Sequence, residues 1–174
     1  MNLIVTPSPQ NPSRGNLLCG DFSYACALGR GGVSTHKTEG DGATPVGIFP
    51  LREVFYRADR VSLPRYAFRN KAINLNDGWC DASGDANYNK FVRLPLPVSA
   101  ESLWRDDHVY DVIVVIGYND DPVIKDKGSA IFMHVATPDF APTAGCVALA
   151  LPDIIAVIQS LSPDSTITIG AQSR

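Results

Sequence analysis

The chain has 174 residues, of which 45% are hydrophobic and 19% are charged, and its formal net charge is −3 at pH 7. A chain of this length fits one domain with a core that needs no disulfide or metal, and its composition excludes a disordered protein. The slightly acidic balance gives no electrostatic case for binding nucleic acid or an anionic membrane surface.

The first part of the chain predicts strands joined by polar loops. Residues 2–6 form a short strand candidate, and residues 20–29, GDFSYACALG, alternate loosely as a second strand that ends at a glycine cluster. Residues 34–47 are rich in turn-forming residues, so we expect a surface loop there. Strand character resumes at residues 48–57.

Residues 57–97 form a long stretch without a periodic pattern. It holds three prolines and many Asn and Asp residues, together with Trp79 and Cys80. Loops of this length in a compact domain usually serve as lids or binding segments. We therefore expect a loop insertion that lies over the functional site.

The second half of the chain predicts a buried core and one helix. Residues 111–118, DVIVVIGY, form the clearest strand, and their unbroken Val/Ile run indicates burial on both faces. Residues 129–135, 146–149 and 166–169 are further strand candidates. Pro152 suits the first position of a helix, and the segment after it is amphipathic. The apolar face of that helix carries Ile154, Ile155, Ile158 and Leu161. The pattern predicts a mainly β domain.

The cysteines and histidines do not predict a disulfide framework or a metal site. None of the four cysteines forms a CxxC pair, and a bridge between Cys19 and Cys26 is an option only in an exported protein. The three histidines show no zinc spacing, and we expect His36 and His108 to lie on the surface, because their neighbours are polar. We expect no metal and no cofactor.

The N-terminal segment MNLIVTPSPQNPSRG lacks the features of a signal peptide. Its apolar run is short and proline follows it, whereas a signal peptide needs a positive start and roughly 7–15 apolar residues. No run approaches the roughly 18 apolar residues of a membrane span. Three alternatives remain: a cytoplasmic protein, a start that is not that of the exported precursor, or another export route.

A histidine and a cysteine in the C-terminal half point to nucleophilic catalysis. His134 ends the apolar run IFMH, and Cys146 follows 12 positions later (146 − 134) within TAGC. The thiolate is the attacking species, and a neighbouring imidazole that accepts its proton makes it available near neutral pH. Strand alternation places Phe132 and His134 on one face, with Ile131 and Met133 on the other. The alternative is a buried cysteine that serves as a small hydrophobe and a core histidine bonded to the backbone.

Gly145 supports the catalytic interpretation, because glycine permits a tight turn and a close approach of substrate. The backbone N–H groups of Gly145 and Cys146 then form a predicted oxyanion hole. In other enzymes one such donor is worth on the order of 3–4 kcal/mol.

These residues resemble the L,D-transpeptidase (YkuD-type) catalytic domain. Members of that family carry a histidine and then, after a loop, the motif Ser/Thr-His-Gly-Cys, followed by a hydrophobic residue and Asn or Arg. In this chain, His134 matches the histidine and residues 143–147, TAGCV, match the motif. Upstream, residues 44–49, TPVGIF, match the Thr-Pro-x-Gly-x-Phe segment of the family. Residues 78–81, GWCD, and 117–119, GYN, are similar to a compact proteobacterial branch.

The resemblance implies a β-rich, sandwich-like catalytic domain that acts on peptidoglycan stem peptides in the cell envelope. Cys146 would attack the carbonyl of an L-centre and form a thioester, while His134 would take the thiol proton and later activate the acceptor. An amine acceptor gives a crosslink, in that branch from L-Ala to diaminopimelate. Water as acceptor gives L,D-carboxypeptidase or endopeptidase activity. The resemblance also implies acylation by β-lactams of the carbapenem class.

Three positions depart from the family pattern. Ala144 replaces a histidine and Ala148 replaces Asn or Arg, so contacts to a substrate carboxylate or carbonyl must come from elsewhere. Val135 follows His134 where some members have Ser, so we expect a backbone carbonyl to orient the imidazole. The departures leave the substrate open, and they are the support for a third function, a non-catalytic peptidoglycan-binding domain.

Several polar and aromatic residues are candidates for substrate contacts. Arg105 suits a carboxylate, because its guanidinium binds both oxygens at once, but in the sequence RDD it also suits a surface ion pair worth roughly 0–1 kcal/mol. The aromatic candidates have core packing as the alternative. The full set is Thr143, Ala144, Arg105, Trp79, Tyr88, Asn89, Tyr118 and Asn119.

Overall fold

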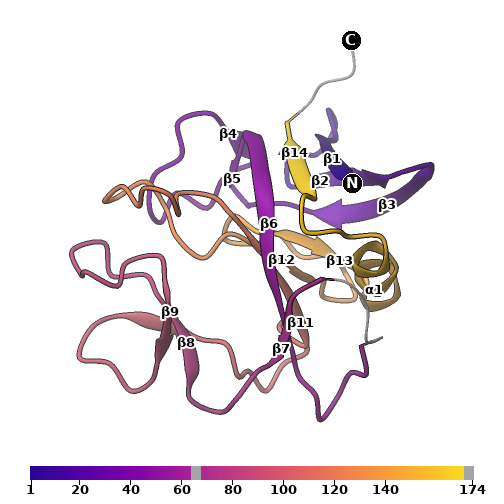
Figure 1. Ribbon diagram of the computed structural model, residues 1–174. Helices are drawn as coiled ribbons and strands as arrows, with labels where there is room; N and C mark the ends of the chain where they lie inside the picture. Colours follow the sequence, from indigo (N-terminus) through magenta and orange to yellow (C-terminus); the bar gives the residue numbers. More distant parts are fainter. Residues whose placement is uncertain (64–67, 171–174) are drawn as a thin grey trace.

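The computed structural model describes residues 1–63 and 68–170 and shows a mainly β fold (Figure 1). Nine strands form the main sheet: β1 (Asn2–Pro7), β2 (Arg14–Cys19), β3 (Phe22–Ala27), β6 (Gly47–Tyr56), β7 (Asn70–Ala72), β11 (Val112–Ile116), β12 (Phe132–Val135), β13 (Val147–Leu149) and β14 (Thr166–Ile169). A small sheet holds β8 (Asp77–Cys80), β9 (Phe91–Arg93) and β10 (Ala100–Ser102), and a two-stranded sheet holds β4 (Val33–Ser34) and β5 (Thr44–Pro45). The described residues include one helix, α1 (Leu151–Gln159).

The main sheet closes on itself. Its strand order is β11-β12-β13-β3-β2-β1-β14-β6-β7, and β6 also pairs with β11 in antiparallel register. Closure removes most free sheet edges, which otherwise invite pairing with other chains. The last strand, β14, lies between β1 and β6, so the C-terminal part of the chain completes the ring.

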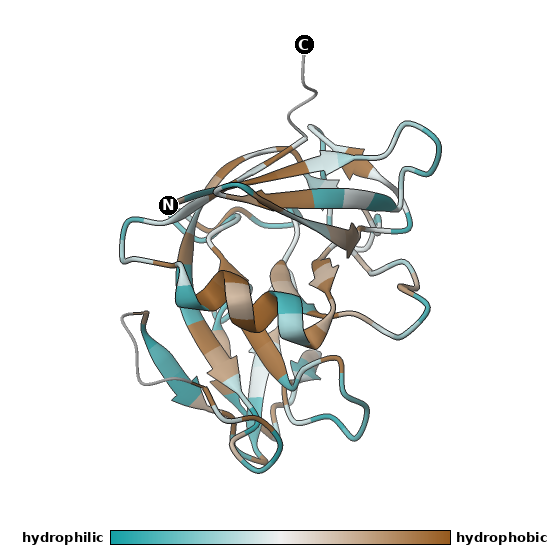
Figure 2. Cartoon of the chain, turned by 90° about the vertical axis from the view of Figure 1, so that its right-hand side faces the viewer, coloured by the Kyte–Doolittle hydropathy of each residue, from teal (hydrophilic) through white to brown (hydrophobic). Residues whose placement is uncertain are grey.

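Strands β11 and β12 are buried on both faces, as the unbroken apolar run of β11 predicts. Val112, Val114 and Met133 belong to the main core inside the sheet. Their alternating neighbours, such as Ile113 and Phe132, belong to a second cluster between the main sheet and the small sheet. Helix α1 lies across the main sheet (Figure 2) and buries Ile154, Val157 and Ile158.

Most predicted elements are confirmed, including the helix and the mainly β class. Strand β2 was not predicted. Its buried positions, Leu17 and Cys19, alternate with the apolar but half-exposed Leu18, so the sequence shows an apolar run instead of an alternation of apolar and polar residues. The predicted strand at residues 20–29 begins only at Phe22, since Gly20 adopts a positive φ of 59° in the turn of the β2–β3 hairpin.

The prediction of a surface loop over residues 34–47 is wrong for its C-terminal part. Ala43 and Thr44 are buried, and the Thr44 hydroxyl accepts a hydrogen bond of 2.8 Å from the Gly29 N–H. The loop approaches so closely that a Cβ at Gly29 would lie 2.2 Å from the carbonyl oxygen of Gly42. A turn-rich composition does not reveal this contact, because it depends on a glycine elsewhere in the chain.

The segment 57–97 carries regular structure that its composition did not predict. It contains β7, which extends the main sheet, and two strands of the small sheet. These strands have three or four residues each, too few to show a period in the sequence. The small sheet stands to one side of the main sheet (Figure 1).

All four cysteines are free and buried. Cys19 pairs with Phe22 next to the hairpin turn, whereas Cys26 pairs with Gly15 near the other end of the hairpin, so the optional Cys19–Cys26 bridge does not form. Within residues 1–63 and 68–170, no helix has the length and apolar character needed to cross a membrane.

Candidate active site

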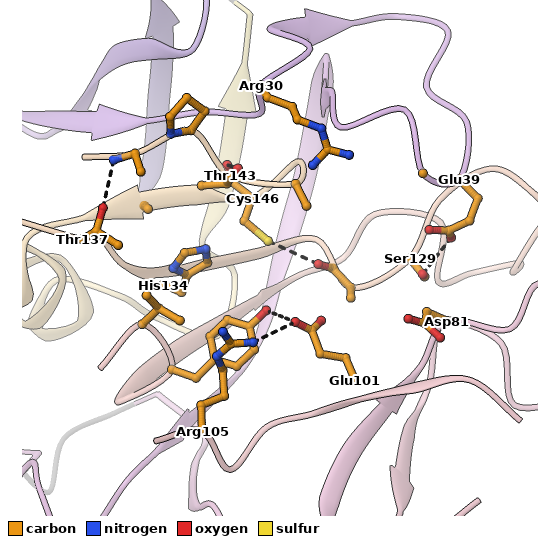
Figure 3. Close-up of a pocket in the computed structure, with 18 of the residues that line it drawn as sticks. Arg30, Glu39, Asp81, Glu101, Arg105, Ser129, His134, Thr137, Thr143 and Cys146 are labelled. Atoms are coloured by element: carbon orange, nitrogen blue, oxygen red, sulfur yellow. Dashed lines mark hydrogen bonds and ion pairs between the residues drawn. The ribbon is translucent and has the colours of Figure 1, made fainter. Parts of the chain in front are cut away.

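The register of two parallel strands brings His134 and Cys146 together. Met133 of β12 pairs with Val147 of β13, and His134 pairs with Ala148. Cys146 directly precedes β13, so it lies level with Phe132, and alternation turns the side chains of Cys146 and His134 to the same face. Both side chains line a cavity of about 570 Å³ (Figure 3).

The Cys146 thiol is held between two backbone groups. The Phe132 N–H donates a hydrogen bond to Sγ at 3.3 Å, and Sγ donates to the carbonyl oxygen of Ala130 at 3.3 Å. Burial raises the pKa of Cys146 to about 12, although the Phe132 N–H acts in the opposite direction. The resting Cys146 side chain is therefore a neutral thiol.

His134 has its imidazole fixed in one tautomer. Its Nδ1 lies 2.9 Å from the carbonyl oxygen of Val135, and a carbonyl only accepts, so Nδ1 carries the proton and Nε2 keeps its lone pair. A backbone carbonyl thus orients the imidazole, as expected from Val135 in place of a serine. Burial lowers the pKa of His134 to about 4. The ring of Tyr110 packs edge-on against the imidazole, with 5.4 Å between centroids.

The turn before Cys146 depends on Gly145. This residue has a φ of 137°, and a Cβ at this position would lie 2.8 Å from the carbonyl oxygen of Ala43. The Thr143 hydroxyl accepts a hydrogen bond from the Gly145 N–H at 3.1 Å and donates one to the Cys146 carbonyl oxygen at 2.7 Å. The Gly145 amide is therefore engaged within the turn, which corrects the expectation that both amides are open to an oxyanion.

The TPVGIF segment supports this turn from the outside. The Thr44 hydroxyl accepts a hydrogen bond from the N–H of Gly29, and Gly29 forms a β-bridge with Thr143. The N–H of Arg30 donates to the Thr143 carbonyl oxygen at 2.9 Å. Two segments that match the same family therefore meet at the loop that carries the cysteine.

Arg105, Thr143 and Ala144 line the cavity with the cysteine and histidine. The guanidinium of Arg105 binds Asp107 at 2.9 and 2.6 Å, and this ion pair raises the pKa of Arg105. Ala148, beside His134 in the register, also lines the cavity, and its methyl group leaves room for the imidazole.

The other predicted contacts do not line this cavity, and they brace its walls instead. Asn89 Oδ1 accepts hydrogen bonds from Trp79 Nε1 at 2.9 Å and from the Ala130 N–H at 3.0 Å. The Tyr88 hydroxyl accepts from the Gly128 N–H at 3.0 Å and donates to Glu39. The remaining two predicted contacts, Tyr118 and Asn119, bond to carbonyl oxygens of the loop that precedes β12.

Several charged residues line the cavity and were not predicted from the sequence. They lie in turn-rich segments and on the short strands, where no periodicity indicates the direction of a side chain. Tyr110 donates a hydrogen bond of 2.7 Å to Glu101, and burial raises the pKa of Glu101. The unpredicted charged residues are Arg30, Lys37, Glu39, Asp81 and Glu101.

A family model described as the L,D-transpeptidase catalytic domain, YkuD, matches residues 15–169. No curated protein and no solved structure matches the chain. The matched range contains the TPVGIF segment, His134, Cys146 and the small sheet.

Proposed function

Because the chain belongs to the L,D-transpeptidase catalytic domain family, we propose that it crosslinks peptidoglycan stem peptides, with Cys146 as the nucleophile and His134 as the base. The supporting observation is that the buried thiol of Cys146 and the imidazole of His134, whose Nε2 is available, lie on the same face of the sheet and line the same cavity. Members of this family act on peptidoglycan peptides. The thioester chemistry and the choice of peptides are our proposal for this chain.

In the first half-reaction, the sulfur of Cys146 attacks the carbonyl carbon of an L-centre in the donor peptide. His134 Nε2 accepts the thiol proton, so that cysteine reacts as a thiolate. A carbon–sulfur bond forms, the carbon–nitrogen bond to the following residue breaks, and His134 returns the proton to the departing amine. The Cys146 N–H has no hydrogen-bond partner among the described residues, so it is available to the developing oxyanion.

In the second half-reaction, the amine of an acceptor peptide attacks the thioester. Its proton passes to His134 Nε2 and then to the departing sulfur of Cys146, and an amide crosslink replaces the thioester. The resemblance leaves two donors open: the L-centre of diaminopimelate, or L-Ala, which gives a crosslink from L-Ala to diaminopimelate. Water in place of the amine gives a carboxylic acid and makes the same site an L,D-carboxypeptidase or endopeptidase.

The neutral resting pair determines when the thiolate forms. The pKa of Cys146 is raised to about 12 and that of His134 is lowered to about 4, both by burial. Proton transfer between them is therefore unfavourable before substrate binds. We expect transfer to accompany attack, because the negative charge then moves from sulfur to the carbonyl oxygen.

The test is acylation of Cys146, followed by mass spectrometry of the intact protein and of the peptide products. The wild type should form a thioester with stem peptides and with a carbapenem, and Cys146→Ala should form neither. Cys19→Ala is the matched control, because Cys19 is a buried free cysteine outside the cavity. Turnover retained in Cys146→Ala would disprove the proposed nucleophile.

Product analysis with and without an added acceptor peptide separates crosslinking from hydrolysis. A crosslinked product that depends on the acceptor supports the transferase, whereas a free acid in both reactions supports the hydrolase. Wild-type protein that binds peptidoglycan but is never acylated would indicate the non-catalytic alternative. A peptidoglycan substrate leads us to propose a location in the cell envelope, with the cytoplasm as the alternative, and fractionation of the source cells tests this.

A further inference from the structure

Tyr110 is a buried residue of the cavity wall that has no part in the proposed reaction steps. It lies two positions before β11, is 6% exposed, and lines the cavity together with Cys146 and His134. The N–H of Val135 donates to the carbonyl oxygen of Val109 at 3.0 Å, which holds the segment before β11 along the end of β12. This contact brings the ring of Tyr110 against the side chains of β12.

The Tyr110 ring contacts two residues of β12 whose side chains share one face. It packs edge-on against the imidazole of His134, with 5.4 Å between centroids and 72° between the planes. It also packs edge-on against Phe132, at 6.0 Å and 77°. The Phe132 N–H donates to Sγ of Cys146. One tyrosine ring therefore adjoins both the imidazole and the residue whose amide holds the thiol.

The small sheet fixes the Tyr110 ring in this position. The hydroxyl of Tyr110 donates a hydrogen bond of 2.7 Å to Glu101, which belongs to β10. The guanidinium of Arg105 lies over the ring, 5.1 Å from its centroid, and approaches Glu101 to 3.8 Å (Figure 3). A ring held by a hydrogen bond, a cation and an aromatic neighbour has little freedom to move away from His134.

The surroundings of His134 show that loss of water, more than any charge, determines its protonation. The residue is 8% exposed, and this burial is the main reason that its pKa is lowered to about 4. The nearby charges act in opposite directions, since Arg105 lowers this pKa and Asp107 raises it, and the two bind each other at 2.6 Å.

The other titratable groups around the imidazole are neutral or lie farther along the cavity wall. The Cys146 thiol and the Tyr110 hydroxyl are neutral, because burial raises the pKa of both. The cavity also holds the charged residues Arg30, Lys37, Glu39, Asp81 and Glu101, of which Glu101 contacts Tyr110. The low exposure of His134 therefore depends on the apolar groups that cover it, and the Tyr110 ring is the aromatic group in contact with it.

We propose that Tyr110 is a positioning residue for His134, and that its ring, anchored to Glu101, holds the imidazole in place and keeps cavity water off it. Tyr110 acts through His134 and takes no part in bond making. A shielded imidazole stays neutral as the pH falls, so it keeps the Nε2 lone pair that the proposed reaction needs. The proposal rests on the proposed function only for the role of His134 as the base.

The test is the titration of His134 in the free full chain, measured by NMR of the imidazole signals. The chain has three histidines, and the His134 signals are those absent from His134→Gln. The wild type should titrate near pH 4. In Tyr110→Ala, the space left beside the imidazole adjoins the cavity, so water fills it and hydrates the imidazolium. We expect the pKa of His134 to rise by at least about one unit, toward the ordinary value of about 6.5.

Two further variants separate the ring from its hydroxyl and from a general loss of packing. Tyr110→Phe should titrate like the wild type, because it keeps the ring and loses only the hydroxyl. Tyr110→Leu fills part of the space without a ring, so we expect a smaller rise of the His134 pKa in the same direction. The comparison of Tyr110→Leu with Tyr110→Phe keeps the test decisive if Tyr110→Ala does not fold.

The matched control is Tyr56→Leu. Tyr56 pairs with Val112 across β6 and β11, packs against the main core and lies outside the cavity lining. This variant should leave the titration of His134 unchanged. A His134 pKa that stays near 4 in Tyr110→Ala and Tyr110→Leu would overturn the proposal, and so would an equal rise in Tyr110→Phe or in the control.

The pH profile of acylation connects this shielding to the reaction. Thioester formation by Tyr110→Ala should fall at the raised pKa of His134, whereas a general loss of structure would lower the rate at every pH without moving the midpoint. A midpoint that does not follow the pKa from NMR would overturn the role of Tyr110 in the reaction. A wild type that no peptide acylates would instead refute the proposed function, and the titration of the free protein would still decide whether Tyr110 shields His134.

Discussion

At the scale of single residues, the site is built from a thiol and an imidazole that are both neutral. Burial removes water from Cys146 and His134 and disfavours their charged forms. The carbonyl of Val135 fixes the proton of His134 on Nδ1, so the lone pair of Nε2 is available to accept a proton. For the proposed reaction, this local geometry supplies a base at neutral pH without a third side chain.

The pH dependence of acylation follows from the lowered pKa of His134. An ordinary histidine loses its function as a base when it is protonated near pH 6.5. Because burial lowers the pKa of His134 to about 4, the imidazole stays neutral as the pH falls to that value. We expect kcat/KM for thioester formation to stay constant as the pH is lowered from neutral to 6, and to fall only near pH 4. Rapid-quench measurement over this range tests the expectation, and a midpoint near 6.5 would contradict it.

At the scale of elements, the position of the proposed nucleophile, Cys146, depends on segments that are distant in the sequence. The Cys146 thiol donates a hydrogen bond to the Ala130 carbonyl oxygen. The Ala130 N–H in turn donates to Oδ1 of Asn89, which lies in the turn between β8 and β9. Asn89 also donates to the carbonyl oxygens of Tyr118 and Asn119 at 3.0 and 2.7 Å. The small sheet thus fixes the loop against which the thiol is placed.

Replacing Asn89 should reduce both stability and acylation. Asn89 has a φ of 56°, so Asn89→Gly removes the side chain without backbone strain. The change leaves buried donors and carbonyls unpaired, each at a cost of about 1–3 kcal/mol. We expect urea unfolding to show a loss of at least about 2 kcal/mol. The exposed Asn87→Gly is the control, and equal stability of the two variants would refute this function of Asn89.

At the scale of the whole molecule, two sheets share the residues of one site. The main sheet supplies Cys146 and His134, and the small sheet supplies Asp81 and Glu101. The sheets contact each other through the second hydrophobic cluster, in which Trp79 packs edge-on against Phe132 with 5.1 Å between centroids. We therefore propose that the chain folds as one domain, to which the small sheet belongs.

Coincident unfolding transitions would test this single-domain proposal. Both tryptophans of the chain, Trp79 and Trp104, lie in or beside the small sheet, so tryptophan fluorescence reports on that region. Far-UV circular dichroism is dominated by the larger main sheet. We expect both signals to give one midpoint in urea, because the shared cluster couples the two sheets. An earlier fluorescence transition would show that the small sheet unfolds separately.

The sequence alone determined the elements with strong local patterns and indicated one candidate nucleophile and one candidate base. The Val/Ile run of β11, the helix after Pro152 and the alternation around His134 are local signals, because periodicity reflects which face of one element is buried. The match of TPVGIF and TAGC to one family indicated a cysteine enzyme. The fold class was therefore predictable, and Cys146 and His134 stay the predicted nucleophile and base.

Only the tertiary structure decided which other residues share the cavity. Trp79, Tyr88, Asn89, Tyr118 and Asn119 resembled substrate contacts, but they brace the walls, whereas Arg30 and Asp81 lie inside. A short polar segment has no period, so its side-chain directions depend on the strands and glycines that it packs against. Long-range contacts form the closed ring and the small sheet and give each charged residue its partner. Local sequence patterns do not predict such contacts.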